Sequence, residues 1–271
     1  MLDLLIGTSG YDYPEWKGVF YPEDLKRKDF LSYYATQFNA LELNNTFYNM
    51  PTAERLLSFY ERSEGKLSFS VKANRLLTHE IGADWQVVAK DFNDALKPLN
   101  EKKRLSAVLF QFPESFHYTV DNRIYLAKLI AEFEGFPVMI EFRHKEWIRE
   151  SVFEGLEKRK AGIVFCDMPK LKNLPDGTVM KTPFIGSNAY IRLHGRNANA
   201  WYAVGESPNG SARYCYDYSD EELAQFAPII KQAKREGKKV QVYFNNHPNG
   251  SGAKNALRLK EMMLGSGEIW K

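Results

Sequence analysis

The sequence predicts an α/β protein built as a single (β/α)8 barrel of the TIM type, with parallel strands. Two observations support this prediction. Eight strand-like segments alternate with helical patterns along the 271 residues, and strict alternation of this kind is typical of parallel strands joined by helices. Seven of the strands end in a polar or charged residue, which suits the carboxyl end of a barrel, where ligands bind. The alternative fold is an open, doubly wound sheet.

The apolar runs and the helical patterns between them give the order of the elements. The eight strands are expected near residues 4–7, 40–44, 67–72, 107–111, 137–143, 163–167, 190–194 and 240–245. Helices are expected at roughly 52–63, 84–100, 120–134, 148–160, 220–236 and 251–264. Long loops follow the first, sixth and seventh strands, and loops of this length are usually functional or mobile. No linker composition divides the chain, so residues 1–271 are expected to form one domain.

The alternation of side chains along each strand predicts which residues face the barrel interior. Side chains two residues apart share one face of a strand. The inward pairs at the strand ends are Glu42 with Asn44, Glu141 with Arg143, Arg192 with His194, and Tyr243 with Asn245. The residues between them, such as Leu193, are apolar and are expected to pack outward under the helices.

Composition limits the classes of function. A formal net charge of +3 is too small to indicate a nucleic-acid partner by itself. The two cysteines have no C-x-x-C spacing, which argues against a disulfide framework. The amino terminus lacks the basic segment of a signal peptide, and no apolar run reaches the length of a membrane helix. We therefore expect a cytoplasmic protein without a membrane partner, and its oligomeric state is left open.

Seven short segments together resemble the signature of a known family. The first, residues 7–22, is a loop rich in glycine, proline and aromatic residues. The others are ELNNTFY at 42–48, SVKA at 70–73, QFP at 111–113, EFRHKEW at 141–147, RLHGR at 192–196 and YFNNH at 243–247. Their order resembles the YecE-like family, also called domain of unknown function 72, over nearly the whole chain, although Tyr11 stands where the family often has tryptophan. The resemblance implies a (β/α)8 barrel without an established activity, and a likeness to endonuclease IV and xylose isomerase that concerns the fold alone.

The inward-facing strand ends and their loops give a set of candidate residues at the barrel mouth. Five carry groups suited to proton transfer or nucleophilic attack: Glu42, Glu141, Asp167, His194 and Lys72. Ten others are candidates for binding a ligand: Ser9, Tyr11, Asn44, Gln111, Arg143, Arg192, Arg196, Tyr243, Asn245 and His247. Barrel interiors are normally filled by Val, Ile and Leu. So many polar residues therefore favour a ligand site over an ion-pair network that only holds the barrel together.

The arginines favour an anionic ligand, either a phosphate-bearing molecule or a carboxylate. Arg143, Arg192 and Arg196 carry fork-shaped donors that match these groups. A helix that starts at Ser251 would add free N–H groups where many barrels bind phosphate. We therefore predict an enzyme, either a hydrolase, an isomerase or a lyase, that acts on an anionic small molecule. If these residues serve a ligand, Arg192→Ala should leave the melting temperature nearly unchanged. If they form an ion-pair network that holds the barrel together, the same substitution should lower the free energy of unfolding by roughly 3–5 kcal/mol.

Two other functions remain open. The aromatic residues of the first and seventh loops suit stacking on bases, which would make the protein a nucleic-acid or nucleotide-binding module. A metal-dependent phosphoesterase resembling endonuclease IV is the other alternative. The suitable metal ligands are Glu42, Glu141, Asp167, His194 and His247. A divalent metal is disfavoured because Lys72, Arg143 and Arg192 compete for the same carboxylates, and the cofactor is left unknown. For Lys72, a salt bridge to Glu42 on the adjacent strand is preferred to a Schiff-base role.

Overall fold

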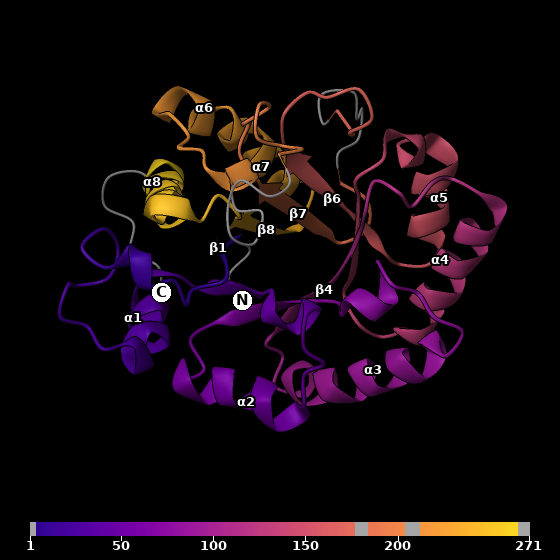
Figure 1. Cartoon of the computed structure of the whole chain (residues 1–271), viewed down its shortest axis with the longest axis horizontal. Helices are drawn as coiled ribbons and strands as arrows, with labels where there is room; N and C mark the ends of the chain where they lie inside the picture. The colour runs from indigo at the N-terminus through magenta and orange to yellow at the C-terminus, as the bar shows by residue number, and fades with distance from the viewer. Residues whose placement is uncertain (1–3, 177–183, 204–211, 265–271) are drawn as a thin grey trace.

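The computed structural model describes residues 4–176, 184–203 and 212–264. Its parallel strands close into a barrel in the order in which they occur along the chain, and β1 pairs with β8. They are β1 (Leu4–Ser9), β2 (Ala40–Leu43), β3 (Ser68–Lys72), β4 (Leu105–Phe112), β5 (Val138–Phe142), β6 (Gly162–Asp167), β7 (Asn188–Leu193) and β8 (Lys239–Phe244). Helices surround these strands (Figure 1). The predicted (β/α)8 barrel is confirmed.

The helices agree with the sequence prediction except at two places. They are α1 (Phe30–Gln37), α2 (Ala53–Arg62), α3 (Trp85–Glu101), α4 (Val120–Glu132), α5 (Glu150–Lys158), α6 (Asp220–Ala224), α7 (Phe226–Arg235) and α8 (Ser251–Leu264). The helix predicted over 220–236 is split at Gln225. Helix α1 was not predicted because its aromatic residues have low helix propensity. Burial of Phe30, Leu31 and Tyr34 against the core stabilises it instead.

Side-chain caps fix where several helices begin. Thr52 and Thr119 accept hydrogen bonds from backbone N–H groups at the start of α2 and α4. At α6, Ser219 and Glu222 form a reciprocal capping box. Between β6 and β7, the described residues 168–176 and 184–187 contain no helix, which agrees with the long loop predicted there.

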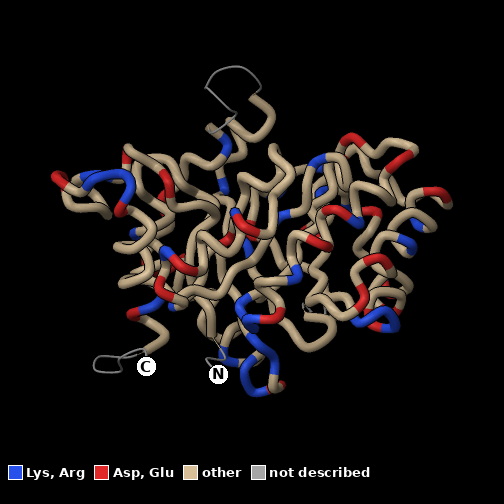
Figure 2. The backbone as a smooth tube through the Cα atoms, turned by 90° about the horizontal axis from the view of Figure 1, so that it is seen from below, with Lys and Arg blue, Asp and Glu red and all other residues tan. Residues whose placement is uncertain are grey.

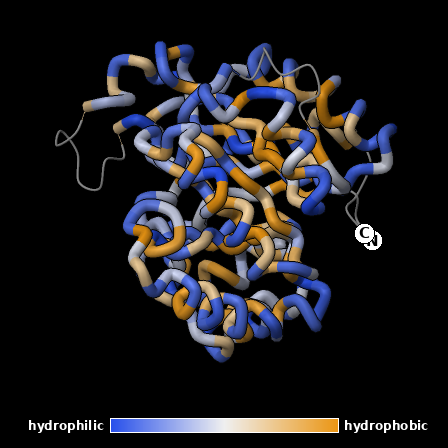
Figure 3. Tube along the Cα trace, turned by 90° about the vertical axis from the view of Figure 1, so that its right-hand side faces the viewer, coloured by the Kyte–Doolittle hydropathy of each residue, from blue (hydrophilic) through white to orange (hydrophobic). Residues whose placement is uncertain are grey.

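The alternation of side chains along the strands produces two layers of packing. Leu41, Ile140, Leu193 and Phe244 face the helices and are fully buried in the outer core. The interior of the barrel is lined in its lower half by small and apolar residues, among them Leu5, Ala40, Ala107, Leu109 and Met139. In Figure 3, hydrophobic stretches run through the middle of the molecule and hydrophilic ones predominate around its edge. The buried charged side chains Glu42, Glu141 and Arg192 lie above this apolar layer, toward the carboxyl ends of the strands. Ser106, Gln241 and Tyr243 are polar groups within the lower half.

Strand β6 does not follow the predicted alternation. Its Cys166 is paired in register with Arg192 of β7, and Asp167 is paired with Leu193. Paired residues on neighbouring strands share a face, so Cys166 faces the interior and Asp167 faces outward with Leu193. The prediction that Asp167 points into the mouth is wrong, because the polar end of the strand was taken as a sign of the inward face.

Charged residues of both signs are interspersed over the molecule. Figure 2 shows Lys and Arg alternating with Asp and Glu along the outer turns of the chain. The sequence holds 37 basic and 34 acidic residues, so the surface carries no strong overall field. In the described part of the chain, every helix is too short or too polar to cross a membrane.

The outer layer of the core should dominate stability. Leu193 is fully buried, and Leu193→Ala should lower the free energy of unfolding by about 2–5 kcal/mol because it leaves a cavity. Ile124 on α4 is half exposed, and Ile124→Ala is the control, with an expected change within about 0.5 kcal/mol. Urea unfolding measures both. Equal stability of the two variants would contradict the outward orientation of Leu193.

Candidate functional site at the barrel mouth

A buried ion-pair network crosses the upper barrel interior, with Arg192 at its centre. Arg192 donates to Oε1 of Glu42 and to Oε2 of Glu141, both at 2.6 Å. All three side chains are at most 2% exposed. Ser9 and Tyr190 also donate to Glu42, each at 2.6 Å. Arg192 is therefore held by two carboxylates through Nη1 and Nη2, and only its Nε is left to meet a ligand. The structural ion-pair interpretation fits this residue better.

Arg143 extends the network to His194. Its Nε donates to Oε1 of Glu141 at 2.5 Å, and its Nη2 lies 3.1 Å from Nε2 of His194. Burial alone would raise the pKa of Glu141. The guanidinium groups of Arg143 and Arg192 overcome this effect and hold that pKa well below its usual range. Glu141 is therefore ionised, and each of its oxygens accepts from an arginine.

His194 is a neutral imidazole of defined tautomer. Burial first, and then the nearby Arg143, lower its pKa to about 3. A guanidinium has only donors, so Nε2 of His194 accepts from Arg143 and the ring proton lies on Nδ1. Nδ1 lies 3.0 Å from Nδ2 of Asn245, and this amide must be turned over to present its oxygen to a protonated Nδ1. The lone pair of His194 is thus covered by Arg143 in this state of the protein.

Lys72 lies apart from the network, and the predicted salt bridge to Glu42 is absent. Its Nζ donates to Oε1 of Gln111 at 3.0 Å and lies 4.2 Å from the centroid of the Phe47 ring. Among the described residues, no carboxylate oxygen lies within 4.0 Å of Nζ. Burial first, and then the positive charge of Arg192, lower the pKa of Lys72 to about 7. The side chain therefore exchanges a proton near neutral pH.

Above the network, two adjoining cavities form what we call the mouth pocket. Their volumes are about 770 and 370 Å³. The residues that line both are Phe47, Tyr48, Lys72, Gln111, Arg143 and Tyr214. Asn44, Arg192, Asn245 and His247 also line the larger cavity. The structure thus brings seven of the fifteen candidate residues to the pocket, whereas Ser9, Glu42, Glu141 and His194 lie among the buried groups of the barrel interior.

Three buried polar atoms of this pocket have no hydrogen-bond partner among the described residues. They are Oδ1 of Asn44, Nε of Arg192 and Nδ1 of His247. Buried polar groups in folded proteins are nearly always satisfied by protein, water or ligand. Their concentration on one cavity indicates that a polar molecule completes the site.

Two predicted ligand-binding tyrosines lie elsewhere. Tyr243 faces the interior, but its hydroxyl contacts Ser106 and Gln241 near the starts of their strands, below the mouth. Tyr11 packs its ring against Tyr34 and Phe59 in the outer core. Its neighbour Tyr13 lines the larger cavity and stacks on His247 with ring centroids 4.7 Å apart. An aromatic of the first loop does reach the mouth, but it is two residues further along the chain.

Asp167 and Arg196 form a separate ion pair outside the mouth pocket. Arg196 donates to both oxygens of Asp167, at 2.9 to 3.1 Å, and Tyr218 donates to Asp167 at 2.6 Å. Arg196 also contacts Glu222 at the start of α6. Neither residue of the pair lines the pocket, so they anchor the loop after β7. The predicted catalytic role of Asp167 and the ligand-binding role of Arg196 are not supported.

The predicted phosphate loop at the start of α8 also lies outside the pocket. Helix α8 begins at Ser251 as predicted. A side chain at Gly250 would collide with Val19, at 2.7 Å, which shows that the turn is packed under the first loop. None of the described residues 248–253 lines either cavity.

Several pocket residues were not among the predicted ones, and Phe47, Tyr48, Glu114 and Arg213 are examples. Phe47 and Tyr48 follow β2, and Glu114 follows β4, at the mouth end of the barrel. Their position directly after a strand is a signal that the sequence contains. Arg213 belongs to the long loop after β7 and has no such signal.

A tightly bound cation does not fit the buried cluster. Glu141, Cys166 and His194 bring possible ligand atoms within 4.8 Å of one another. Arginines already occupy both oxygens of Glu141, and their positive charges would repel a metal ion. Burial also raises the pKa of Cys166 well above its usual value, which opposes the thiolate that a metal needs.

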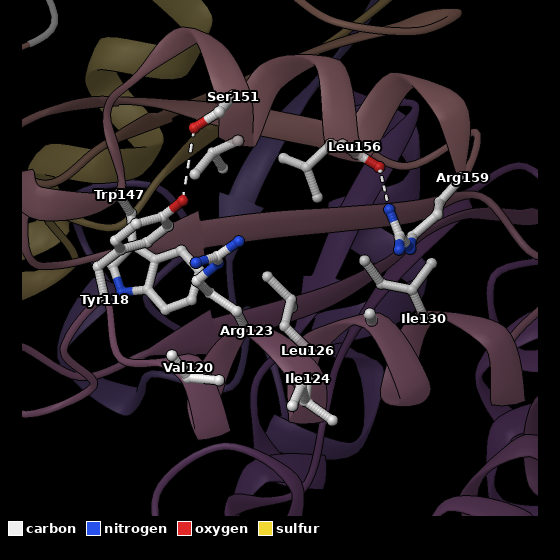
Figure 4. Close-up of a pocket in the computed structure, with 13 residues that line it drawn as sticks. Tyr118, Val120, Arg123, Ile124, Leu126, Ile130, Trp147, Ser151, Leu156 and Arg159 are labelled. Atoms are coloured by element: carbon white, nitrogen blue, oxygen red, sulfur yellow. Dashed lines mark hydrogen bonds between the residues drawn. The ribbon is translucent and has the colours of Figure 1, made fainter.

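A further cavity of about 340 Å³ lies in the helix layer between α4 and α5. Figure 4 shows Ile124, Leu126 and Ile130 lining it, with Arg123 and Arg159 projecting toward it. Its lining contains no Asp, Glu, His, Cys or Lys. The cavity is separate from the strand ends, and Tyr118 is the one titratable side chain of its lining besides the two arginines.

The network predicts a large stability effect for its central arginine. Arg192→Ala leaves two buried carboxylates without their charged partner and should lower the free energy of unfolding by roughly 3–5 kcal/mol. Arg258 is the matched control because it also pairs with two carboxylates, Asp220 and Glu261, but is 49% exposed. Arg258→Ala should change stability far less. A melting temperature of Arg192→Ala equal to that of the native protein would restore the ligand-binding interpretation of this residue.

Comparison with known proteins places the chain in a family. The model of "Protein of unknown function DUF72" matches residues 5–269. The UPF0759 protein YunF of Bacillus subtilis is 26% identical over 270 residues, which cover 96% of this chain and 94% of that protein. A crystal structure of a DUF72 family protein (TM1631) from Thermotoga maritima is 35% identical with a TM-score of 0.85, covering 96% and 98% of the two chains. One from Enterococcus faecalis (EF0366) shares the fold at 23% identity and a TM-score of 0.83, covering 98% and 97%. The chain therefore belongs to the DUF72 family.

Proposed function

We propose that the protein is an enzyme that binds an anionic small molecule, carrying a phosphate or a carboxylate, in the mouth pocket. The observation that carries this proposal is the Nε of Arg192, a cationic donor that is unpaired among the described residues and lines the larger cavity together with Lys72 and Arg143. Both oxygens of Glu42 and of Glu141 accept from residues of the barrel interior. Nε of Arg192 is a buried donor without an acceptor. An anion supplies an acceptor for this donor and offsets the positive charge of protonated Lys72.

The charges that line the pocket support this choice of ligand. Lys72, Arg143 and Arg213 line it together with two carboxylates, Glu15 and Glu114. Glu15 is exposed at the rim, and Glu114 already accepts hydrogen bonds from Asn173 and Tyr202. The deeper part of the pocket is therefore positive.

Catalysis would use Lys72, the pocket group whose pKa of about 7 lets it exchange a proton near neutral pH. His194 is fully buried, does not line the pocket and has its pKa lowered to about 3, so on this proposal it orients Arg143. Glu42 and Glu141 are positioning residues on this proposal, because their oxygens orient Arg192 and Arg143. Hydrolysis, isomerisation and lyase chemistry are all compatible with this set.

Nucleotide or single-strand binding is a second candidate, favoured by aromatic residues at the pocket rim. Tyr48 is 65% exposed and Tyr202 is 54% exposed, and both line the smaller cavity. Exposed aromatic rings of this kind stack on bases. An affinity for single-stranded nucleic acid that falls steeply with rising salt concentration would support this candidate.

The proposed anion site predicts a pH-dependent affinity for sulfate, which does not titrate near neutral pH. Protonated Lys72 attracts the anion, and its pKa of about 7 means that this attraction is lost as the pH rises. Between pH 6 and 8.5 the affinity should fall by up to roughly thirtyfold. Isothermal titration calorimetry measures it.

Two variants sharpen this test. Lys72→Arg keeps the positive charge at high pH and should remove most of the pH dependence. Arg143→Met should weaken binding at every pH. Absence of sulfate binding, or an affinity indifferent to both substitutions, would overturn the proposed anion site.

A further inference from the structure

Lys72 is placed as a reactive amine rather than as an ion-pair partner. It ends β3 at the mouth of the barrel and lines both cavities of the mouth pocket. Its Nζ is held by the amide oxygen of Gln111 and the ring of Phe47. Neither partner is charged. A carboxylate would fix the lysine as an ammonium ion, whereas these two neutral partners hold the amine in place and leave it able to lose its proton.

The charges of the site favour the neutral amine. With a pKa of about 7, roughly half of Lys72 is neutral at pH 7. A lysine with the ordinary pKa of about 10.4 is neutral in only about one molecule in 2,500 at that pH. Since only the neutral amine attacks carbonyl carbon, Lys72 has an advantage of roughly three orders of magnitude over exposed lysines in the fraction that can react.

We propose that Lys72 is a nucleophile that forms a Schiff base with an aldehyde or ketone bearing an anionic group. The lone pair of Nζ attacks the carbonyl carbon and forms the C–N bond. The two amine protons leave with the carbonyl oxygen as water, which yields the imine and needs no oxidant or other co-reactant. The inference rests on the proposed function, because the anion site holds the substrate.

The surroundings of Lys72 suit each state of this reaction. Gln111 accepts from Nζ and fixes the direction of the amine before attack. The protonated imine carries a positive charge, and the face of Phe47, 4.2 Å from Nζ, stabilises such a cation. Arg143 lines the same cavities and is placed to hold the anionic end of the substrate.

Reductive trapping tests the proposal. The protein is incubated with glyoxylate, an aldehyde that carries a carboxylate, and with cyanoborohydride, which reduces the imine to a stable secondary amine. Peptide mass mapping then compares labelling of Lys72 with that of Lys97, an internal control whose side chain is 56% exposed. At pH 7 we expect labelling of Lys72 to exceed that of Lys97 by at least tenfold.

The pH profile and a neutral aldehyde supply the matched controls. The trapping rate of Lys72 should be half-maximal near pH 7 and level above pH 8, and sulfate should suppress it. Propanal should give a smaller ratio of Lys72 to Lys97 labelling, because it lacks the anionic group. In Lys72→Arg the labelling at position 72 disappears while sulfate binding remains.

The outcomes separate this inference from the proposed function. Sulfate binding that depends on Arg143 and on pH, together with labelling of Lys72 no faster than Lys97, overturns the nucleophile and leaves the anion site standing. Equal labelling ratios for glyoxylate and propanal, with no effect of sulfate, overturn the anionic substrate class.

Discussion

The architecture of the barrel mouth depends on one buried interaction, the bridge that Arg192 makes between Glu42 and Glu141. It joins β7 to β2 on one side and to β5 on the other, across the barrel interior. Three charges without access to water are tolerated only when they are paired and hydrogen-bonded. Ser9, Tyr190 and Arg143 provide the remaining hydrogen bonds to the carboxylates. The bridge therefore has to form completely, and through Glu141 it also fixes Arg143, which in turn contacts His194.

The inward-facing residues could be predicted from the sequence because strand geometry is local. A period of two along β2, β5, β7 and β8 places Glu42, Glu141, Arg192 and Asn245 correctly, and no tertiary information is needed for this. The same rule failed on β6, where both faces are apolar up to the last two residues. Without a hydrophobic contrast between faces, the polar Asp167 was assigned inward, although the register with β7 turns Cys166 inward instead.

Pairing between side chains could not be predicted in the same way. Lys72 and Glu42 lie on adjacent strands, and a salt bridge was the natural expectation. Glu42 is instead saturated by Ser9, Tyr190 and Arg192, and the choice among these partners depends on distances across the barrel. Loop residues posed a similar difficulty. Tyr13 rather than Tyr11 reaches the mouth, because the turn of the first loop sets the direction of each side chain.

The balance of charge explains why Lys72 is the group through which this site would respond to a ligand. In the network, the two carboxylates of Glu42 and Glu141 offset the two guanidinium groups of Arg143 and Arg192. His194 is held neutral by burial and by Arg143. A proton on Lys72 therefore adds a positive charge that the network does not compensate, and its loss costs little near neutral pH. A bound anion favours the ammonium, whereas a bound carbonyl consumes the amine. The same lysine can thus bind an anion when it is protonated and attack a carbonyl when it is neutral. The positive charge of Arg192 in the buried bridge helps to lower the pKa of Lys72 to about 7, so both forms are present near neutral pH.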